Sequence, residues 1–217
     1  VGDLMQVYAI GYLHGERDFY KFFRYLNLFI FSMLILGMAD NLLLTFVGWE
    51  GVGACSYFLI AFWFTVDANA TAGKKAFVTT RIGDWGVLLA MFVAFASYGT
   101  LEYVELTGLA RSGQMAAVTA TAIAGLLFIG AIGKSAQLPL FVWLPDAMAG
   151  PTPVSALNHS ATIVTAGVFL LERSKAILDA GYDRLPTTIA GVGAITALIA
   201  ATIADSQNDI QNLLEYT

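Results

Sequence analysis

The chain is built from long apolar runs separated by short polar segments. A helix needs about 20 mainly apolar residues to cross the hydrocarbon core of a bilayer. Residues 1–13 are too few for a span, and we expect them to be the tail of one that begins upstream. Five complete runs predict transmembrane helices, at residues 25–39, 42–64, 74–97, 154–171 and 185–204.

A further apolar run, residues 115–150, is too long for one span, because as a single helix it would extend about 54 Å. Pro139 and Pro145 lie within it. Proline removes a backbone hydrogen bond and clashes with the preceding turn, so we expect the helix to break there. A broken helix at membrane depth is tolerated only where it faces protein or water. The pattern therefore predicts an all-α, polytopic transmembrane bundle with one proline-broken helix.

The polar segments between the runs are expected to lie at the membrane surfaces. Residues 14–24, 66–72 and 172–184 read as loops, and residues 98–114 as a short surface helix. Lys and Arg are shared almost evenly between the two sets of loops, so the positive-inside rule does not orient the chain.

Composition agrees with a membrane protein. Of the 217 residues, 58% are hydrophobic and 12% charged, whereas soluble domains carry about 25% charged residues. A net charge of −5 gives no basic footprint for nucleic acid. The single cysteine, Cys55, excludes an internal disulfide and a cysteine-rich metal site, and the two histidines show no ligand-like spacing. We therefore expect no metal site and no nucleic-acid partner, and the lipid bilayer as the surroundings.

The candidate chemistry comes from ionisable residues inside the apolar runs. Residues 115–133 contain no charged side chain, yet Lys134 follows them directly. A charge at membrane depth costs roughly 2.5–3.5 kcal/mol on insertion scales, so it needs a partner or a task. Other apolar runs carry the possible partners, which are Glu50, Arg81, Asp84 and His159.

These residue types are suited to passing protons through a membrane. A buried ammonium has a lowered pKa and a nearby carboxylate raises it again, so Glu50 and Lys134 would titrate as a coupled pair. His159 titrates near neutrality and would carry the proton onward. Arg81 and Asp84 are three residues apart on one helix face, so they can pair and tune the same field. The residues predict a buried Glu–Lys–His relay with a modulating ion pair.

Structural interpretations stay open at each of these positions. Lys134 and Glu50 can belong to a purely structural ion pair, Arg81 and Asp84 can neutralise each other, and His159 can be a hydrogen-bonded helix residue. Two further features read as structural, namely Asp146 as a helix cap or interface residue, and Lys74 and Lys75 as interfacial anchors.

Long motifs in the chain resemble those of a known family. The segments 39–64, 72–90 and 130–174 contain GWEGVG at 48–53 and GKSAQLPL at 133–140. They are similar to the largest antiporter-like membrane subunit of respiratory complex I (NADH:quinone oxidoreductase), called subunit L in bacteria and chain 5 in mitochondria. The likeness covers nearly the whole chain but only the front half of such a subunit. We therefore interpret residues 1–217 as one partial antiporter-like domain of an inverted-repeat fold, with further helices upstream and a second repeat missing.

The resemblance implies a role for each candidate residue. Glu50, Lys134 and His159 match the family's fifth-helix glutamate, broken-helix lysine and eighth-helix histidine, and Arg81 and Asp84 match its modulating pair. The chain would then be a non-redox, proton-translocating subunit of an enzyme, in a bacterial plasma membrane or the mitochondrial inner membrane. It would bind no cofactor itself, with FMN, iron–sulfur clusters and quinone in other subunits. Its partners would be other membrane-arm subunits, further antiporter-like subunits among them.

Departures from the family pattern and two rival functions remain. Asn158 and Ser160 replace apolar residues beside the histidine, and Gln211–Asn212 replaces an expected basic pair. One rival is a cation/proton antiporter subunit of the related multi-subunit (Mrp-like) type, which shares many of these motifs. The other is a membrane scaffold fragment that conducts no protons.

Overall fold

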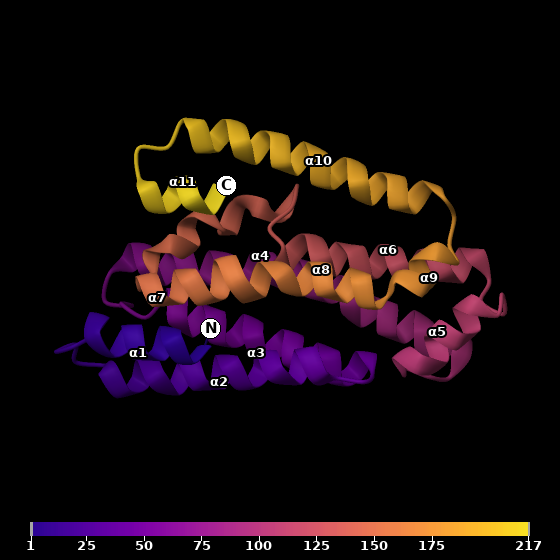
Figure 1. The fold of residues 1–217 in the computed structure, drawn as a ribbon, viewed down its shortest axis with the longest axis horizontal. Coiled ribbons are helices and arrows are strands. Elements are labelled where there is room, and N and C mark those ends of the chain that lie inside the picture. Colours follow the sequence, from indigo (N-terminus) through magenta and orange to yellow (C-terminus); the bar gives the residue numbers. More distant parts are fainter. Residues whose placement is uncertain (1, 217) are drawn as a thin grey trace.

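The computed structural model describes residues 2–216, apart from the side chains of residues 158–161, 211 and 215. The described residues form helices joined by short turns, with one isolated antiparallel bridge between Asn41 and Glu102. Figure 1 shows most of the long helices lying side by side along one axis, as expected for a membrane bundle. The predicted all-α transmembrane fold is confirmed.

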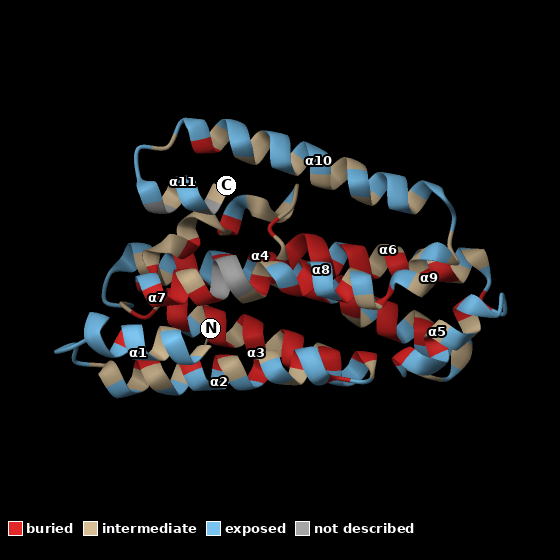
Figure 2. Ribbon diagram, viewed as in Figure 1, coloured by how far each residue is buried: buried red, intermediate tan, exposed pale blue. Residues whose placement is uncertain are grey.

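Five of the described helices are long and apolar enough to cross a membrane. They are α2 (Phe19–Met38), α3 (Leu42–Ile60), α4 (Asp67–Tyr98), α6 (Ala117–Lys134) and α10 (Arg184–Asp205). The first four pack closely, whereas α10 runs apart from the bundle with only 6% of its most apolar window buried (Figures 1 and 2). The core that can hold buried charges therefore lies among α2, α3, α4 and α6.

Among the described residues, four shorter helices lie at the ends of the bundle or between the spans. They are α1 (Gly2–Tyr12), α5 (Tyr103–Arg111), α9 (Lys175–Asp179) and α11 (Ile210–Tyr216). The predicted surface helix within residues 98–114 is α5, but it is not only superficial, because Tyr103 and Leu106 are buried in the core. Part of the predicted loop 172–184 is helical, as α9.

Two predicted loops were partly wrong. Helix α2 begins at Phe19 rather than near residue 25, and α4 begins at Asp67 rather than near residue 74. Polar residues need not end a helix at a membrane surface, because long Lys and Arg side chains lie along apolar surface and reach the water with their charged ends. Lys21 shows the reason, since its ammonium lies 4.8 Å from the Phe64 ring centroid.

The predicted break in the run 115–150 is present, but it begins earlier than Pro139. Helix α6 ends at Lys134, and the next helical turns are the 3₁₀ helices η1 (Leu140–Trp143) and η2 (Pro145–Ala149). The ring of Pro139 would clash with the carbonyl one turn back, at residue 135, which places the end of α6 just before that residue. Lys134 is therefore the last residue of its helix.

The predicted span 154–171 is a composite helix rather than one α-helix. It consists of α7 (Thr152–Val154), the π-helix η3 (Ser155–Thr162) and α8 (Ile163–Arg173) in direct succession. π-Helical turns are rare overall, but where they occur they often lie at functional sites. Residue 159, the predicted relay histidine, lies on this π-helical segment.

Glycines bring the central helices unusually close. A Cβ added at Gly83 of α4 would lie 2.9 Å from the Cα of Gly133 on α6 and 3.1 Å from the Ile129 carbonyl oxygen. A Cβ at Gly86 would lie 2.6 Å from the Leu126 carbonyl oxygen. Small residues at helix contacts let backbones approach in membranes. This approach sets the α4 residue Asp84 beside the end of α6.

We expect Gly83→Ala to destabilise the bundle by about 1–3 kcal/mol, because the methyl group must push two backbones apart. Gly125→Ala on α6 is the matched control, since a Cβ there meets nothing within 4 Å. Thermal unfolding of the purified assembly measures the difference. Equal midpoints for the two variants would contradict the close α4–α6 contact.

Candidate functional site

The Lys134 side chain is fully enclosed by three helices. Its residue is 1% exposed, and its Nζ lies 3.5 Å from Asp84 Oδ2 on α4 and 5.7 Å from the Trp49 ring centroid on α3. A Cβ added at Gly53 would lie 2.6 Å from this Nζ, so the glycine leaves the space that the ammonium fills. Lys134 therefore reaches from the end of α6 toward α3 and α4.

Asp84 is the carboxylate that balances this ammonium. Its side chain is 2% exposed, and the two oxygens have different tasks. Oδ1 accepts a hydrogen bond of 2.6 Å from the Trp49 indole, whereas Oδ2 faces both Lys134 and Arg81 Nε, which lies 3.7 Å away. One oxygen is thus fixed by a neutral donor and the other is shared between two cations.

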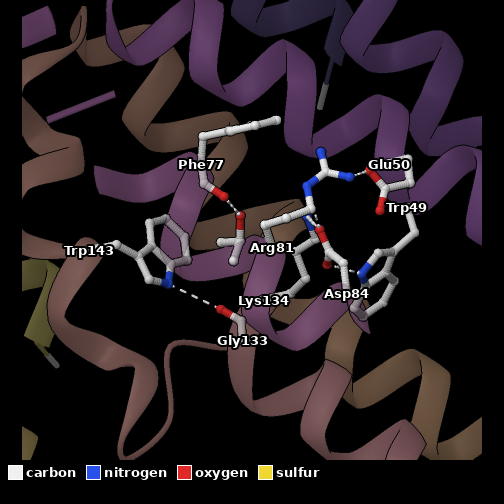
Figure 3. Close-up of polar contacts among 9 residues, drawn as sticks. Trp49, Glu50, Phe77, Arg81, Asp84, Gly133, Lys134 and Trp143 are labelled. Carbon is white, nitrogen blue, oxygen red and sulfur yellow. Dashed lines mark hydrogen bonds and ion pairs between the residues drawn. The ribbon is translucent and has the colours of Figure 1, made fainter. Parts of the chain in front are cut away.

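Arg81 continues the set toward Glu50. Its guanidinium forms an ion pair with the Glu50 carboxylate on α3 and lies 4.5 Å from the Phe77 ring centroid. The Arg81 and Glu50 side chains are 33% and 23% exposed, so this end is less enclosed than the Lys134 end. Figure 3 shows Arg81 between Glu50 and Asp84, with Trp49 beyond the Asp84 carboxylate.

The result is a charge chain, which we define as Glu50–Arg81–Asp84–Lys134. Negative and positive groups alternate along it, and its formal charges sum to zero. The predicted pairing of Arg81 with Asp84 is present at 3.7 Å. Glu50 and Lys134 are brought to the same site, but their described ion pairs are with Arg81 and Asp84 respectively. Glu50 and Lys134 are therefore connected through Arg81 and Asp84, the pair that was expected only to modulate the relay.

His159 lies outside the residues whose side chains the structure describes. Its place in the relay stays a prediction. The backbone places residue 159 in η3, which continues into α8, and α8 packs against α6 through Gly167. A Cβ at Gly167 would lie 2.9 Å from the Ala131 carbonyl oxygen on α6.

A small cavity of about 10 Å³ adjoins the Lys134 side chain. That volume is close to the smallest that holds one water molecule. Its lining includes the polar residues Ser56, Tyr57 and Thr80 together with the Trp143 indole. The site can therefore hold a water molecule next to the ammonium, at the point where α6 ends.

Sequence reasoning missed two features of the site. The Trp49 indole donates a hydrogen bond to Asp84, and its ring lies against Lys134. The one signal in the sequence for this role is general: a buried indole N–H usually needs a hydrogen-bond partner. The second feature is the ion pair between Lys75 of α4 and Asp146 of η2. Both residues were interpreted as separate structural groups, because nothing in the sequence shows that η2 folds back onto α4.

The sequence and fold of the chain are similar to those of known proteins. The family model described as "NADH:quinone oxidoreductase/Mrp antiporter, TM" matches residues 39–217. The NADH-quinone oxidoreductase subunit L of Mycobacterium tuberculosis is 48% identical over 217 residues, covering 99% of this chain and 33% of the relative. Subunit L of Escherichia coli is 48% identical over 221 residues, covering 100% of this chain and 35% of the relative. The chain thus spans about a third of the length of the curated relatives it matches.

Solved structures agree with these relatives. A chain of the Mrp complex from Dietzia sp. superimposes with a TM-score of 0.80 at 33% identity, covering 88% of this chain and 21% of that one. These relatives are subunits of multi-subunit membrane complexes. Together with the five apolar helices, they show that the chain is an integral membrane protein.

We expect Lys134→Met and Asp84→Asn each to destabilise the protein, by up to about 3–5 kcal/mol, because Asp84→Asn leaves Lys134 without a counter-charge and Lys134→Met leaves Asp84 with only the 3.7 Å contact to Arg81. The double variant should lose less than the sum of the two single losses, since no unpaired charge remains. A double-mutant cycle on thermal stability measures this coupling. A cycle of Lys134→Met with Glu105→Gln, an exposed residue of α5, should be additive. Additivity in both cycles would contradict the buried pair.

Proposed function

The chain belongs to the NADH:quinone oxidoreductase/Mrp antiporter transmembrane family, and we propose from this that it is a proton-translocating membrane subunit of an NADH:quinone oxidoreductase. The observation that carries the proposal is the charge chain, whose Asp84–Lys134 end is buried where α3, α4 and α6 meet. Charges at membrane depth are costly and commonly mark ion or proton paths. Relatives at 48% identity are named as subunits of that enzyme.

The alternating charges give the chain a way to move protons. Asp84 Oδ2 faces two cations at 3.5 and 3.7 Å, which are longer than the distances of about 2.7–2.9 Å typical of strong charged hydrogen bonds. A small shift of Arg81 toward Glu50 leaves Asp84 to hold Lys134, and a shift toward Asp84 weakens that hold. The protonation of Lys134 thereby depends on where Arg81 lies.

The proton on Lys134 needs an exit, and the small cavity beside it supplies one position for water. From there we propose that His159 receives the proton and leads it on through the π-helical segment. Proton movement would be driven by quinone reduction elsewhere in the complex. FMN, iron–sulfur clusters and quinone would then be held by other subunits, and further antiporter-like subunits would be neighbours in the membrane arm.

The rival function is that of a subunit in an Mrp-type cation/proton antiporter. The Dietzia structure favours it, because its fold agrees closely at 33% identity. The higher identity to subunit L favours the oxidoreductase. Purifying the native assembly separates the two, since flavin and iron–sulfur absorbance is expected for the oxidoreductase and is not expected for an antiporter.

We expect Lys134→Ala to abolish proton translocation through this subunit, and so to lower the ratio of protons to electrons, while NADH oxidation by the assembled complex continues. The reason is that the charge chain then ends at Asp84, with no group to carry the proton to the cavity. The measurement is the ratio of protons moved to electrons transferred in membrane vesicles. Lys175→Ala, an exposed lysine of α9, is the control and should keep the ratio. An unchanged ratio in Lys134→Ala would reject the proposed function.

A further inference from the structure

The segment after the break, η1 and η2, has little structure of its own to hold it in place. Both are short 3₁₀ helices, which have poorer hydrogen-bond geometry than α-helices and rarely extend beyond a few residues. Its buried residues Trp143 and Ala147 are 1% and 0% exposed. The segment therefore depends on its contacts with neighbouring helices for its position.

This position determines whether the space beside Lys134 is closed. The Trp143 indole donates a hydrogen bond of 3.0 Å to the carbonyl oxygen of Gly133, one of the carbonyls that the end of α6 leaves without a helical partner. The same indole forms one wall of the cavity that Lys134 and Thr80 also line (Figure 3 shows the Trp143–Gly133 bond beside Lys134). Moving η1 away from α4 would open the cavity.

A charged contact fastens the segment to α4. Asp146, in the first turn of η2, forms an ion pair with Lys75 of α4, and both side chains are 44% exposed. Lys75 precedes Arg81 by six positions, or about 9 Å along the helix. The ion pair therefore joins η2 to α4 about two helical turns from the charge chain.

We infer that the Lys75–Asp146 ion pair is a positioning contact that keeps η1 and η2 on α4, and thereby keeps Trp143 as a closed wall of the Lys134 cavity. Opening of the pair admits water to Lys134 from this end of the bundle. The consequence for proton transfer rests on the proposed function, whereas the control of water access does not. The simpler interpretation is an exposed ion pair of no consequence, because such pairs contribute only about 0–1 kcal/mol at a protein surface.

The test measures how readily the cavity opens, with a thiol placed in its wall. Thr80 is buried and lines the cavity, so Thr80→Cys in a Cys55→Ala background puts one reactive thiol of this chain beside Lys134. The variant subunit is studied in the assembled complex in native membranes. N-ethylmaleimide is the probe, and mass spectrometry of the peptide that contains residue 80 gives the reaction rate.

We expect slow labelling with the intact pair, and labelling about fivefold faster in Lys75→Gln or Asp146→Asn, which is the change that a loss of about 1 kcal/mol produces. Lys74→Gln removes the neighbouring positive charge and should leave the rate unchanged. The exchanged pair, Lys75→Asp with Asp146→Lys, should return the rate toward the starting value, and Lys75→Arg should keep it slow.

Equal rates in the parent and both single variants would overturn the inference, as would a Lys74→Gln effect of the same size. An exchanged pair that labels as fast as the single variants would also overturn it. None of these rates requires proton translocation. A Lys134→Ala variant with unchanged coupling would therefore reject the proposed function and leave the labelling rates to decide the role of the ion pair.

Discussion

The structure depends on how the bundle tolerates one buried ammonium. Lys134 ends α6 in a position where it is 1% exposed, and the surrounding helices are arranged to accept it. Gly83 and Gly133 let α4 and α6 approach until the Asp84 carboxylate lies 3.5 Å from the ammonium, and Gly53 leaves the room that its Nζ occupies. A side chain at any of these three glycines would disturb the charge, the helix contact or both. The packing and the electrostatics are therefore one constraint.

Much of this could be predicted from the sequence, because hydrophobic pattern and helical spacing are local properties. The long apolar runs predicted the spans, and the three-residue spacing of Arg81 and Asp84 predicted their contact. Which helices meet is not a local property. Glu50 was expected beside Lys134, and only the arrangement of α3, α4 and α6 shows that Arg81 holds Glu50 while Asp84 holds Lys134. The Trp49–Asp84 bond was hidden for the same reason.

The errors in helix boundaries have a common cause. Phe19 and Asp67 begin their helices within segments that read as polar loops. Helices in membranes continue through such segments when aromatic rings and long basic side chains suit the interface. The break after Lys134 shows the reverse case. Proline marks the disturbance, but the helix already ends at Lys134, and the Trp143 indole takes over the Gly133 carbonyl that this end leaves without a helical partner.

The geometry of Asp84 supports the proposal that the charge chain does more than neutralise buried charges. A purely structural carboxylate is best held by short bonds on both oxygens, since every unsatisfied buried acceptor is costly. Asp84 instead has one short bond, 2.6 Å from Trp49, and two long cation contacts at 3.5 and 3.7 Å on the other oxygen. The Trp49 indole fixes the position of the carboxylate, and Arg81 and Lys134 lie at similar, long distances from its other oxygen. In the proposed mechanism, this anchored acceptor lets a small displacement of the Arg81 side chain change the charge balance at Lys134 without moving a helix.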